Sequence, residues 1–452
     1  DWASDGIYSS GGLEARYLSD ALLQGDEGDD RLYVGYSKNA RLEGGTGNDY
    51  LEAYAYGYQL SEIGEAYGVN YQLDGGADDD ILSVTSYAYN NFGRIDLALE
   101  GGTGNDRLTV STDNPAKQNY GISSAVLSGG DGEDRLEANG VLQLTLTGGG
   151  GTDTFVLTAQ QYQAQQKGTL QFAAQAQTEA NGWDYALTDV TARAMEITDF
   201  QAGVGGDVLD IQDLMRNAAI GFDGSNTFGP GGYLRLIQSQ ELPTDTWLQF
   251  DVDGNGDNYI TLAVLKNVTV SSLVGANFNP AYPVDGSVMP GIILDGTLNA
   301  DTLAGTAGTD TIRGLEGDDV VDGDAGDDLI YGGVGNDTLD GNFGNDSVYG
   351  EAGDDVLIDS QVSNYLDGGE GNDRITAEAL TGDHTLVGGL GNDILEGVGQ
   401  SLLLQGGDGV DQLTASGQLD LNGTRTYVQH GQATLSGGAG NDGEWYYADW
   451  AS

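Results

Sequence analysis

The 452-residue sequence has no cysteine, two histidines, six prolines and only 16 lysine and arginine residues. Without cysteine, no disulfide bond can stiffen the chain in an oxidising compartment. No apolar run approaches the roughly 20 residues that a membrane-spanning helix needs. So few basic residues leave no positive face to neutralise phosphates, which excludes nucleic acid as a partner.

Glycine and acidic residues dominate instead. The chain has 75 glycines and 71 aspartates and glutamates, with a formal net charge of −55. Carboxylates about 4 Å apart repel one another by about 1 kcal/mol even in water. Hydrophobic residues make up 38% of the chain, with 24 tyrosines, which argues against simple disorder. We therefore expect bound cations to be part of the fold.

A nonapeptide repeats seven times without a gap from Leu294 to Val356. Each copy opens on an aliphatic residue and has an aspartate at its eighth position. The aliphatic residues are Leu294, Leu303, Ile312, Val321, Ile330, Leu339 and Val348, and the aspartates are Asp301, Asp310, Asp319, Asp328, Asp337, Asp346 and Asp355. A regular nine-residue spacing kept over seven copies predicts a solenoid.

The spacing predicts the geometry of that solenoid. The aliphatic residue centres a short strand, and the glycines that follow allow the chain to turn back. Two nonapeptides complete a coil of 18 residues, and coils stack at about 4.8 Å. Asp319 then lies beside Asp337, and Asp328 beside Asp346. Carboxylates and turn carbonyls in this arrangement form oxygen cages that suit calcium.

The segment Gly332–Leu339 reads GGVGNDTL and resembles the RTX family of calcium-binding nonapeptide repeats, whose pattern is G-G-x-G-x-D-x-U-x. The resemblance implies a parallel β-roll, export by type I secretion, and calcium bound by the motif aspartate and by turn carbonyls such as those of Gly332 and Gly335. In the first nonapeptide Asn299 replaces the third glycine, so Asp301 is not counted among the predicted ligands.

The same motif occurs singly elsewhere. Its aspartates before and after the tandem block are Asp30, Asp49, Asp80, Asp106, Asp134, Asp153, Asp373, Asp393, Asp411 and Asp442. From Asp355 to Asp411 the spacings are 18, 20 and 18 residues, which predicts that one calcium turn per coil is kept and the opposite turn becomes an ordinary loop. In the first part the longer spacings predict a broader, one-sided roll. The motif of Asp80 departs from the pattern at Asp78.

The repeat stops between the two blocks. Residues 160–177 are rich in Gln and Ala and are compatible with a helix or a strand-and-loop excursion. The stretches 197–211 and 250–268 resemble the terminal module of type I secreted proteins, here at an internal position, which favours a capping or spacer domain. Asp251, Asp253, Asn255 and Asp257 begin like an EF-hand loop but lack its final Glu, so a calcium loop and a solvated acidic turn both remain open.

These patterns predict an all-β chain with parallel β-roll solenoids on either side of a small β-rich domain. The predicted domains are a one-sided roll at 1–158, a spacer or cap at 159–290 and a second roll at 291–452. Catalysis is not expected. His384 and His430 lie outside any known catalytic pattern and are expected to be surface or loop residues.

Tyrosines recur in the first roll, at Tyr54, Tyr56, Tyr58, Tyr67, Tyr71, Tyr87 and Tyr89. Stacking of aromatic side chains on one sheet face is the favoured interpretation. A surface that binds a glycan or another partner is the alternative.

The tetrapeptide DWAS both opens and closes the chain, at Asp1–Ser4 and Asp449–Ser452. It indicates tandem copies in a giant protein, or subunits that meet head to tail, unless it is a cloning artefact or coincidence. The absence of a signal peptide and the start at Asp1 suggest a mature form or a fragment. After Asp442 the core aliphatic residue gives way to Trp445 and two tyrosines, which suits docking to another surface.

The expected function is a secreted, calcium-dependent structural or adhesive element: a filament, surface-layer or adhesin segment that self-associates head to tail. One alternative is the RTX region of a secreted hydrolase or epimerase whose catalytic domain lies outside this chain. The other is a carbohydrate-binding module that recognises a cell-surface glycan.

Overall fold

The computed structural model describes residues 7–440. Gaps lie at residues 10–11, 17, 19, 57–67, 88–94, 113–121, 167–168, 179–181, 192, 221, 223, 225, 229–231, 240–241, 257, 360–362, 379–381, 417, 422–423 and 428–431. The chain divides into two compact units. The first contains residues 1–219 and 233–279, and the second contains residues 220–232 and 280–452.

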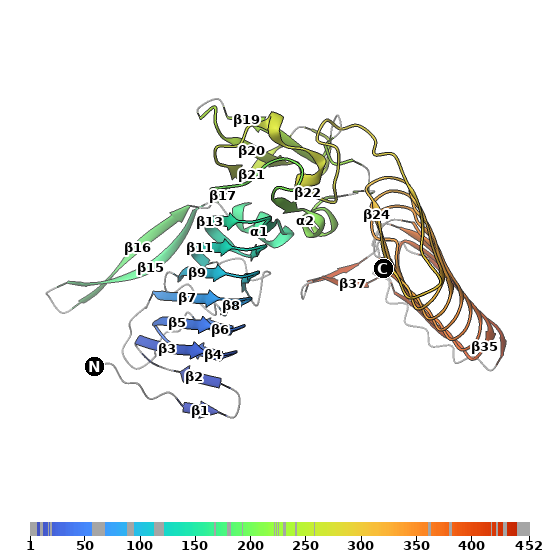
Figure 1. Ribbon diagram of the computed structural model, residues 1–452, viewed down its shortest axis with the longest axis horizontal. Helices are drawn as coiled ribbons and strands as arrows, with labels where there is room; N and C mark the ends of the chain where they lie inside the picture. Colours follow the sequence, from blue (N-terminus) through green and yellow to red (C-terminus); the bar gives the residue numbers. More distant parts are fainter. Residues whose placement is uncertain are drawn as a thin grey trace. The chain divides into compact units, whose positions relative to one another are not determined.

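The first unit, the N-terminal roll, is built on two ten-stranded sheets (Figure 1). Sheet 1 contains, in spatial order, β1 (Ile7–Ser9), β2 (Gly12–Arg16), β4 (Arg31–Gly35), β6 (Tyr50–Tyr56), β8 (Ile81–Tyr87), β10 (Arg107–Thr112), β12 (Arg135–Ala138), β14 (Thr154–Val156), β18 (Val208–Asp210) and β22 (Phe278–Asn279). Sheet 2 contains β3 (Asp20–Glu27), β5 (Asn39–Thr46), β7 (Val69–Ala77), β9 (Ile95–Thr103), β11 (Ile122–Asp131), β13 (Val141–Gly150), β17 (Met195–Ile197), β21 (Ile260–Leu265), β20 (Thr246–Phe250) and β19 (Leu234–Gln238).

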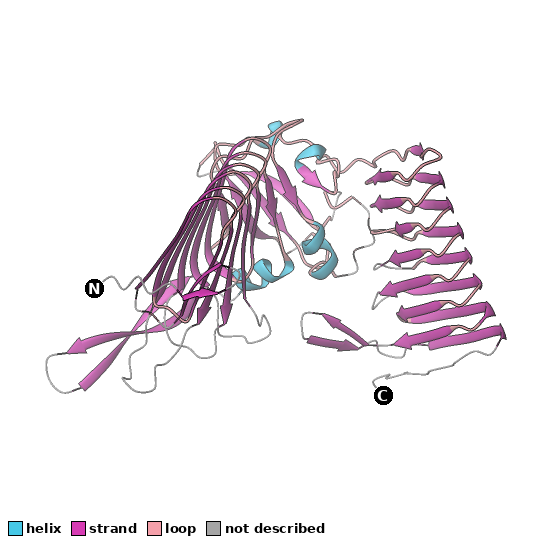
Figure 2. Cartoon of the chain, turned by 60° about the horizontal axis from the view of Figure 1, so that its bottom comes forward, coloured by secondary structure: helices cyan, strands magenta, loops and turns pink. Residues whose placement is uncertain are grey.

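The second unit, the C-terminal roll, repeats this plan, and Figure 2 shows its strands stacked one beside the next. Sheet 3 contains β23 (Ile293–Asp295), β25 (Thr311–Glu316), β27 (Leu329–Val334), β29 (Ser347–Ala352), β31 (Tyr365–Glu370), β33 (Asp383–Leu390), β35 (Ser401–Gly409) and β39 (Gln432–Gly440). Sheet 4 contains β24 (Thr302–Thr306), β26 (Val320–Asp324), β28 (Thr338–Asp340), β30 (Val356–Asp359), β32 (Arg374–Glu378), β34 (Ile394–Val398) and β36 (Gln412–Ser416). All neighbours in these two sheets pair in parallel. The predicted all-β fold of parallel β-rolls is confirmed.

The repeat phase sets the core of each roll. Alternate side chains of a strand point to the same face, so the aliphatic residue of every nonapeptide points inward. Ile312, Ile330 and Val348 of sheet 3 occupy one register position in successive coils, and each is fully buried. Val321 and Leu339 do the same in sheet 4. One continuous apolar column therefore runs along the interior of the C-terminal roll.

The middle segment belongs to the N-terminal roll, which differs from the boundary predicted after residue 158. Its strands β18 and β22 extend sheet 1, and β17 and β21 extend sheet 2, all in parallel. The antiparallel strands β19 and β20 then close sheet 2. The segment is thus a cap continuous with both sheets, and it also contributes residues 220–232 to the second unit.

Helices are few and short. They are α1 (Ala159–Gln166), α2 (Gln212–Asn217) and the 3-10 turns η1 (Val270–Ser272) and η2 (Gly275–Asn277). The Gln-rich region forms both α1 and strand β15 (Thr169–Thr178), which pairs with β16 (Gly182–Thr191); a second hairpin joins β37 (Gln418–Leu421) to β38 (Thr424–Tyr427). Among the described residues, no helix is both long and apolar enough to cross a membrane.

Tyrosines pack mainly against one another along the strand stack. Tyr54 packs against Tyr87 with ring centroids 5.5 Å apart, as the stacking interpretation predicted. Tyr71 is an exception, because it is fully buried and its hydroxyl donates to the carbonyl oxygen of Ser37 at 2.7 Å. Tyr331 and Tyr349 stack at 5.2 Å, so each covers a face of the other ring. Tyr58, Tyr67 and Tyr89 lie outside the described residues.

The second position of most glycine-rich turns adopts a positive φ angle, whether glycine or another residue occupies it. Gly333 has φ of 117°, and Leu315, one coil earlier, has φ of 87°. A side chain in this left-handed region costs about 1–2 kcal/mol, which is why glycine dominates there. Asp26, Asn342 and Glu351 show the same conformation. The stacked coils therefore impose the turn even where the sequence opposes it.

Replacing Leu315 by glycine should relieve this strain. We expect Leu315→Gly to raise the free energy of unfolding in saturating calcium by about 1 kcal/mol, after allowance for the greater entropy of glycine in the unfolded chain. Urea unfolding followed by circular dichroism measures the change. Leu390→Gly is the matched control, since Leu390 is similarly exposed and lacks a positive φ. Equal effects of the two substitutions would contradict the explanation.

Candidate metal sites in the glycine-rich turns

The motif aspartates gather along the turns that join the two sheets of each roll. In the N-terminal roll the motif turns lead from sheet 2 to sheet 1, as between β5 and β6. In the C-terminal roll they occur on both sides. The long column, after sheet 3 strands, contains Asp301, Asp319, Asp337, Asp355, Asp373, Asp393 and Asp411; the short column, after sheet 4 strands, contains Asp310, Asp328 and Asp346.

One oxygen of each carboxylate joins neighbouring coils. Asp337 accepts a hydrogen bond through Oδ1 from the backbone N–H of Asp319 at 2.8 Å, and Asp346 accepts one from Asp328 at 2.7 Å. Both predicted neighbour pairs are thus confirmed. The same bond, at 2.7–3.0 Å, continues from Asp30 to Asp153 in the N-terminal roll and from Asp301 to Asp411 in the long column.

The other carboxylate oxygen is buried and receives no hydrogen bond. Among the described residues this holds for Oδ2 of Asp30, Asp49, Asp80, Asp106, Asp134, Asp153, Asp319, Asp328, Asp337, Asp355, Asp373 and Asp393. A buried carboxylate oxygen without a donor is costly. Its repetition at one position of successive motifs points to a shared external partner.

The first glycine of each motif shows where these oxygens point. A Cβ atom added to Gly323 would lie 2.6 Å from Oδ2 of Asp328 and 2.7 Å from the carbonyl oxygen of Gly341, one coil further on. Oxygens from two successive coils therefore face one small space that is open only because the residue is glycine. Hard oxygen donors from a carboxylate and from backbone carbonyls are the ligands that calcium takes in proteins. The turns fit calcium.

The pKa values follow from the same burial. Desolvation raises the pKa of Asp328 to about 9, and the nearby carboxylate of Asp346 adds to the rise. Desolvation likewise raises the pKa of Asp80 and of Asp373 to about 7. Without a cation, these turns hold protons more strongly than ordinary aspartates do.

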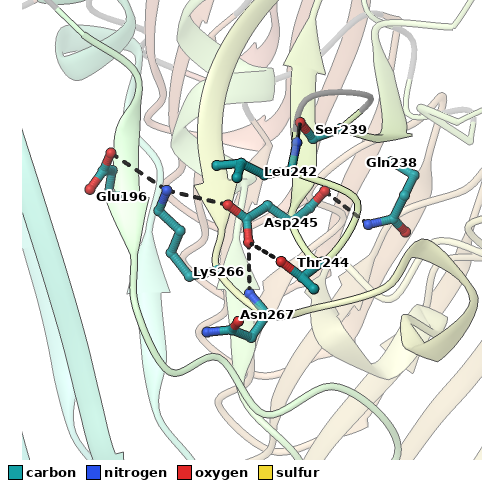
Figure 3. Close-up of polar contacts among 8 residues, drawn as sticks. All are labelled: Glu196, Gln238, Ser239, Leu242, Thr244, Asp245, Lys266 and Asn267. Atoms are coloured by element: carbon teal, nitrogen blue, oxygen red, sulfur yellow. Dashed lines mark hydrogen bonds and ion pairs between the residues drawn. The ribbon is translucent and has the colours of Figure 1, made fainter.

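Asp245 shows how a buried aspartate looks when the protein satisfies it (Figure 3). It is 4% exposed, and its carboxylate accepts bonds from the N–H of Asn267 at 3.1 Å and from Nζ of Lys266 at 3.3 Å. Burial raises its pKa, but these donors and the Thr244 hydroxyl outweigh burial and hold the pKa below its usual value. The motif aspartates with an unsatisfied Oδ2 have no such set of donors.

The first two repeats of the C-terminal roll differ from the rest. Threonine replaces the second glycine, and the N–H of Thr297 donates to Oδ2 of Asp301 while the N–H of Thr306 donates to Oδ2 of Asp310, both at 2.5 Å. The threonine N–H thus takes the place that a cation would have. Asp310 was predicted as a ligand from its spacing, and in the structure it shares the local pairing of Asp301 instead of the open oxygen of Asp328.

Other predicted positions vary. The irregular turn at Asp78 still brings Asp80 into line, with its N–H 2.8 Å from Oδ1 of Asp106. Oδ2 of Asp251 accepts the N–H of Gly256 at 2.7 Å. The carboxylate of Asp253 accepts from the backbone and side chain of Asn255, as in a local turn. Asp257 and Asp442 lie outside the described residues, as does His430.

His384 is not a surface residue, contrary to expectation. It is 1% exposed on β33, and its Nδ1 lies 3.4 Å from the backbone N–H of Asn364. Asn364 in turn accepts the N–H of Asp346 at 2.7 Å. Burial lowers the pKa of His384 to about 4. The short column thus continues from aspartate into two uncharged side chains.

Two further buried aspartates, Asp207 and Asp359, are not predicted by the nonapeptide pattern. Asp207 extends the N-terminal column, because its Oδ1 accepts the N–H of Asp153 at 3.0 Å and its Oδ2 accepts that of Gln201 at 2.8 Å. Its position in a Gly-Asp pair before a strand was the only sequence signal. Asp359 lies inside a strand and carries no motif signal.

An outer ladder runs beside the motif aspartates. Asp or Asn side chains just before several motif aspartates accept a backbone N–H from the following coil, as when Asp318 accepts from Asn336 at 2.8 Å and Asn336 accepts from Asp354 at 2.8 Å. Asp29 and Asn48 begin the same series in the N-terminal roll. The bonds between successive motif aspartates form an inner ladder, in which each carboxylate accepts from the preceding coil. The two ladders therefore run in opposite directions.

These turns define a class of protein: a parallel β-roll whose stacked acidic bends are built to hold cations. Among the described residues no group of three or more His, Cys, Asp or Glu side chains gathers at one point. Each site therefore depends on one or two carboxylates together with backbone carbonyls of successive coils.

The particular family follows from comparison. The RTX calcium-binding nonapeptide repeat matches in four copies, at residues 34–55, 295–330, 331–358 and 362–395. The chain therefore contains RTX calcium-binding nonapeptide repeats, and repeats of this kind bind calcium. No protein in a search of curated sequences matches the chain.

Removing one motif carboxylate should weaken calcium-dependent folding. Asp355→Asn keeps the Oδ1 acceptor for Asp337 and removes the charge. Since one site at 100-fold saturation contributes about 2.7 kcal/mol, we expect a loss of about 1–3 kcal/mol in the free energy of unfolding in calcium. Asp354→Asn is the control, because Asp354 is exposed and adjacent. Equal losses in both variants would show that the effect is general charge removal.

The metal-free protein should lose stability as pH rises. Burial raises the folded-state pKa of Asp106 to about 6, of Asp80 to about 7 and of Asp328 to about 9, from an ordinary 3.8. The folded chain then binds more protons than the unfolded chain, so stability present near pH 4 declines toward pH 7 and above. His384 has the opposite effect on the pH dependence, because its lowered pKa makes the folded chain bind fewer protons, but it is only one group. Circular dichroism of metal-stripped protein from pH 4 to 8 tests this: β structure present near pH 4 should be lost as the pH rises, and β structure that stays constant or increases with pH would contradict it. Calcium should remove the decline.

Proposed function

We propose that this chain is an extracellular structural or adhesive element, of the filament, surface-layer or adhesin kind, that folds and assembles when it meets calcium after type I secretion. The observation that carries the proposal is the column of buried Oδ2 atoms that lack a donor in most of the described motif turns. A chain with a net charge of −55 cannot supply these cations from its own 16 basic residues.

The energetics support calcium as the signal for folding. Extracellular calcium modules bind at about 10⁻⁴–10⁻³ M, far above cytoplasmic concentrations. Several sites that each contribute about 2.7 kcal/mol together match or exceed the 5–15 kcal/mol net stability of a typical domain. The chain would therefore stay unfolded before export and fold outside the cell. Unfolded passage through a secretion channel fits this order of events.

The ends of the rolls support head-to-tail assembly. Among the described strands, β3 pairs only with β5, and β39 only with β35, so each leaves one edge of backbone donors and acceptors open. Open sheet edges are templates for pairing with another chain. A head-to-tail contact that does not close into a ring builds a filament.

The test compares metal-stripped protein with and without millimolar calcium. We expect calcium to convert an unfolded spectrum into β circular dichroism, and electron microscopy to show linear polymers only in calcium. Magnesium at the same concentration is the control, because it demands a stricter octahedral geometry. Full β structure in excess chelator would contradict calcium-dependent folding. Calcium-folded protein that stays monomeric at high concentration would contradict assembly alone.

A further inference from the structure

One carboxylate of the C-terminal roll lies in its interior instead of in a turn. Asp359 ends strand β30, two residues after Leu357. Residues two apart on a strand share a face, and both side chains are 0% exposed. Asp359 pairs in register with the buried Ala377 of the next coil. It therefore carries a potential charge at a position where its neighbours in the column are small and apolar.

The preceding coil shows what Asp359 faces. A Cβ atom on Gly341 would lie 2.5 Å from Oδ2 of Asp359 and 2.8 Å from Oδ2 of Asp346. At the equivalent position one coil earlier, Gly323 faces Oδ2 of Asp328 and a backbone carbonyl. Here a second carboxylate has replaced the carbonyl.

Two buried carboxylates that face one space cannot both stay ionised without a cation or a shared proton. Oδ2 of Asp346 receives no hydrogen bond from an N–H or hydroxyl among the described residues, and Asp346 is 1% exposed. A divalent cation balances both charges, whereas a single-carboxylate turn leaves the ion half compensated. The charge count of the ligands is one of the factors that set calcium affinity.

The next coils on this side offer no further charge. Asn364 accepts the N–H of Asp346, and His384 stands behind Asn364 in the same column. The pair of Asp346 and Asp359 is thus the last acidic position of the short column. In the following coil Asn364 takes the place of a motif aspartate. The second carboxylate, from Asp359, supplies the negative charge that Asn364 lacks.

We propose that Asp346 and Asp359 together bind one calcium ion, more tightly than the single-carboxylate turns do, and that this ion closes the short column. The inference rests on the calcium binding of the proposed function. It adds a ligand from within a strand, outside the nonapeptide motif.

The test is calcium titration of metal-stripped full-length chain by calorimetry, with bound calcium counted by emission spectroscopy after dialysis. We expect Asp359→Asn to weaken the tightest class of sites by about tenfold or more, because half of the compensating charge is lost. Asp359→Gly restores the glycine of the other coils and should retain the ion at the affinity of an ordinary turn. This second variant keeps the test decisive if Asp359→Asn fails to fold.

Two controls separate the possible failures. Glu378→Gln removes an exposed charge from the neighbouring strand and should change nothing. Asp337→Asn should cost one ordinary site. If Asp359→Asn binds the same number of ions with unchanged affinity and is more stable without metal, the two carboxylates share a proton and the inference is wrong. If the wild-type chain binds no calcium at all, the proposed function fails instead.

Discussion

A buried aspartate with one satisfied oxygen and one unsatisfied oxygen recurs along both rolls. The satisfied oxygen fixes the distance between coils, and the unsatisfied one requires positive charge. Asp245 meets that requirement with Lys266 and a backbone donor. The chain has too few lysines and arginines to repeat this solution in every coil. The chain therefore combines few basic residues with many acidic turns, and the cations that these turns require must come from the surrounding medium.

Glycine makes that design geometrically possible, and its roles differ within a motif. The first glycine keeps open the space where a carboxylate and a carbonyl meet, as at Gly323. The second adopts positive φ, which Leu315 tolerates at a cost. The third also has positive φ and lies against the backbone of the coil before it, as Gly335 lies against Gly317. Substitutions are thus tolerated at the second position, while the first is kept where a cation is to be held.

The nonapeptide phase predicted the rolls and the neighbour pairs of the long and short columns, because a fixed period determines which residues stack. It did not reveal Asp207, which stands 54 residues beyond Asp153. Nor did it reveal Asp359, because the proposed role of this residue depends on its side chain lying on the buried face of β30. Thr306 binds Asp310 through a local bond that spacing alone does not report. The joining of the middle segment to both sheets is a long-range pairing, which has no periodic signal in the sequence.

The two opposed hydrogen-bond ladders give each roll a polarity. Along the inner ladder a coil donates forward and accepts from behind, and along the outer ladder it accepts from the coil ahead. A coil within a roll therefore presents an inner donor beside an outer acceptor to the coil ahead, and the reverse pair to the coil behind. Ends of unlike kind are complementary, whereas two like ends would set donor against donor. Any fibre that continued these ladders across subunits would be unidirectional, with chemically distinct tips and a single growth sense.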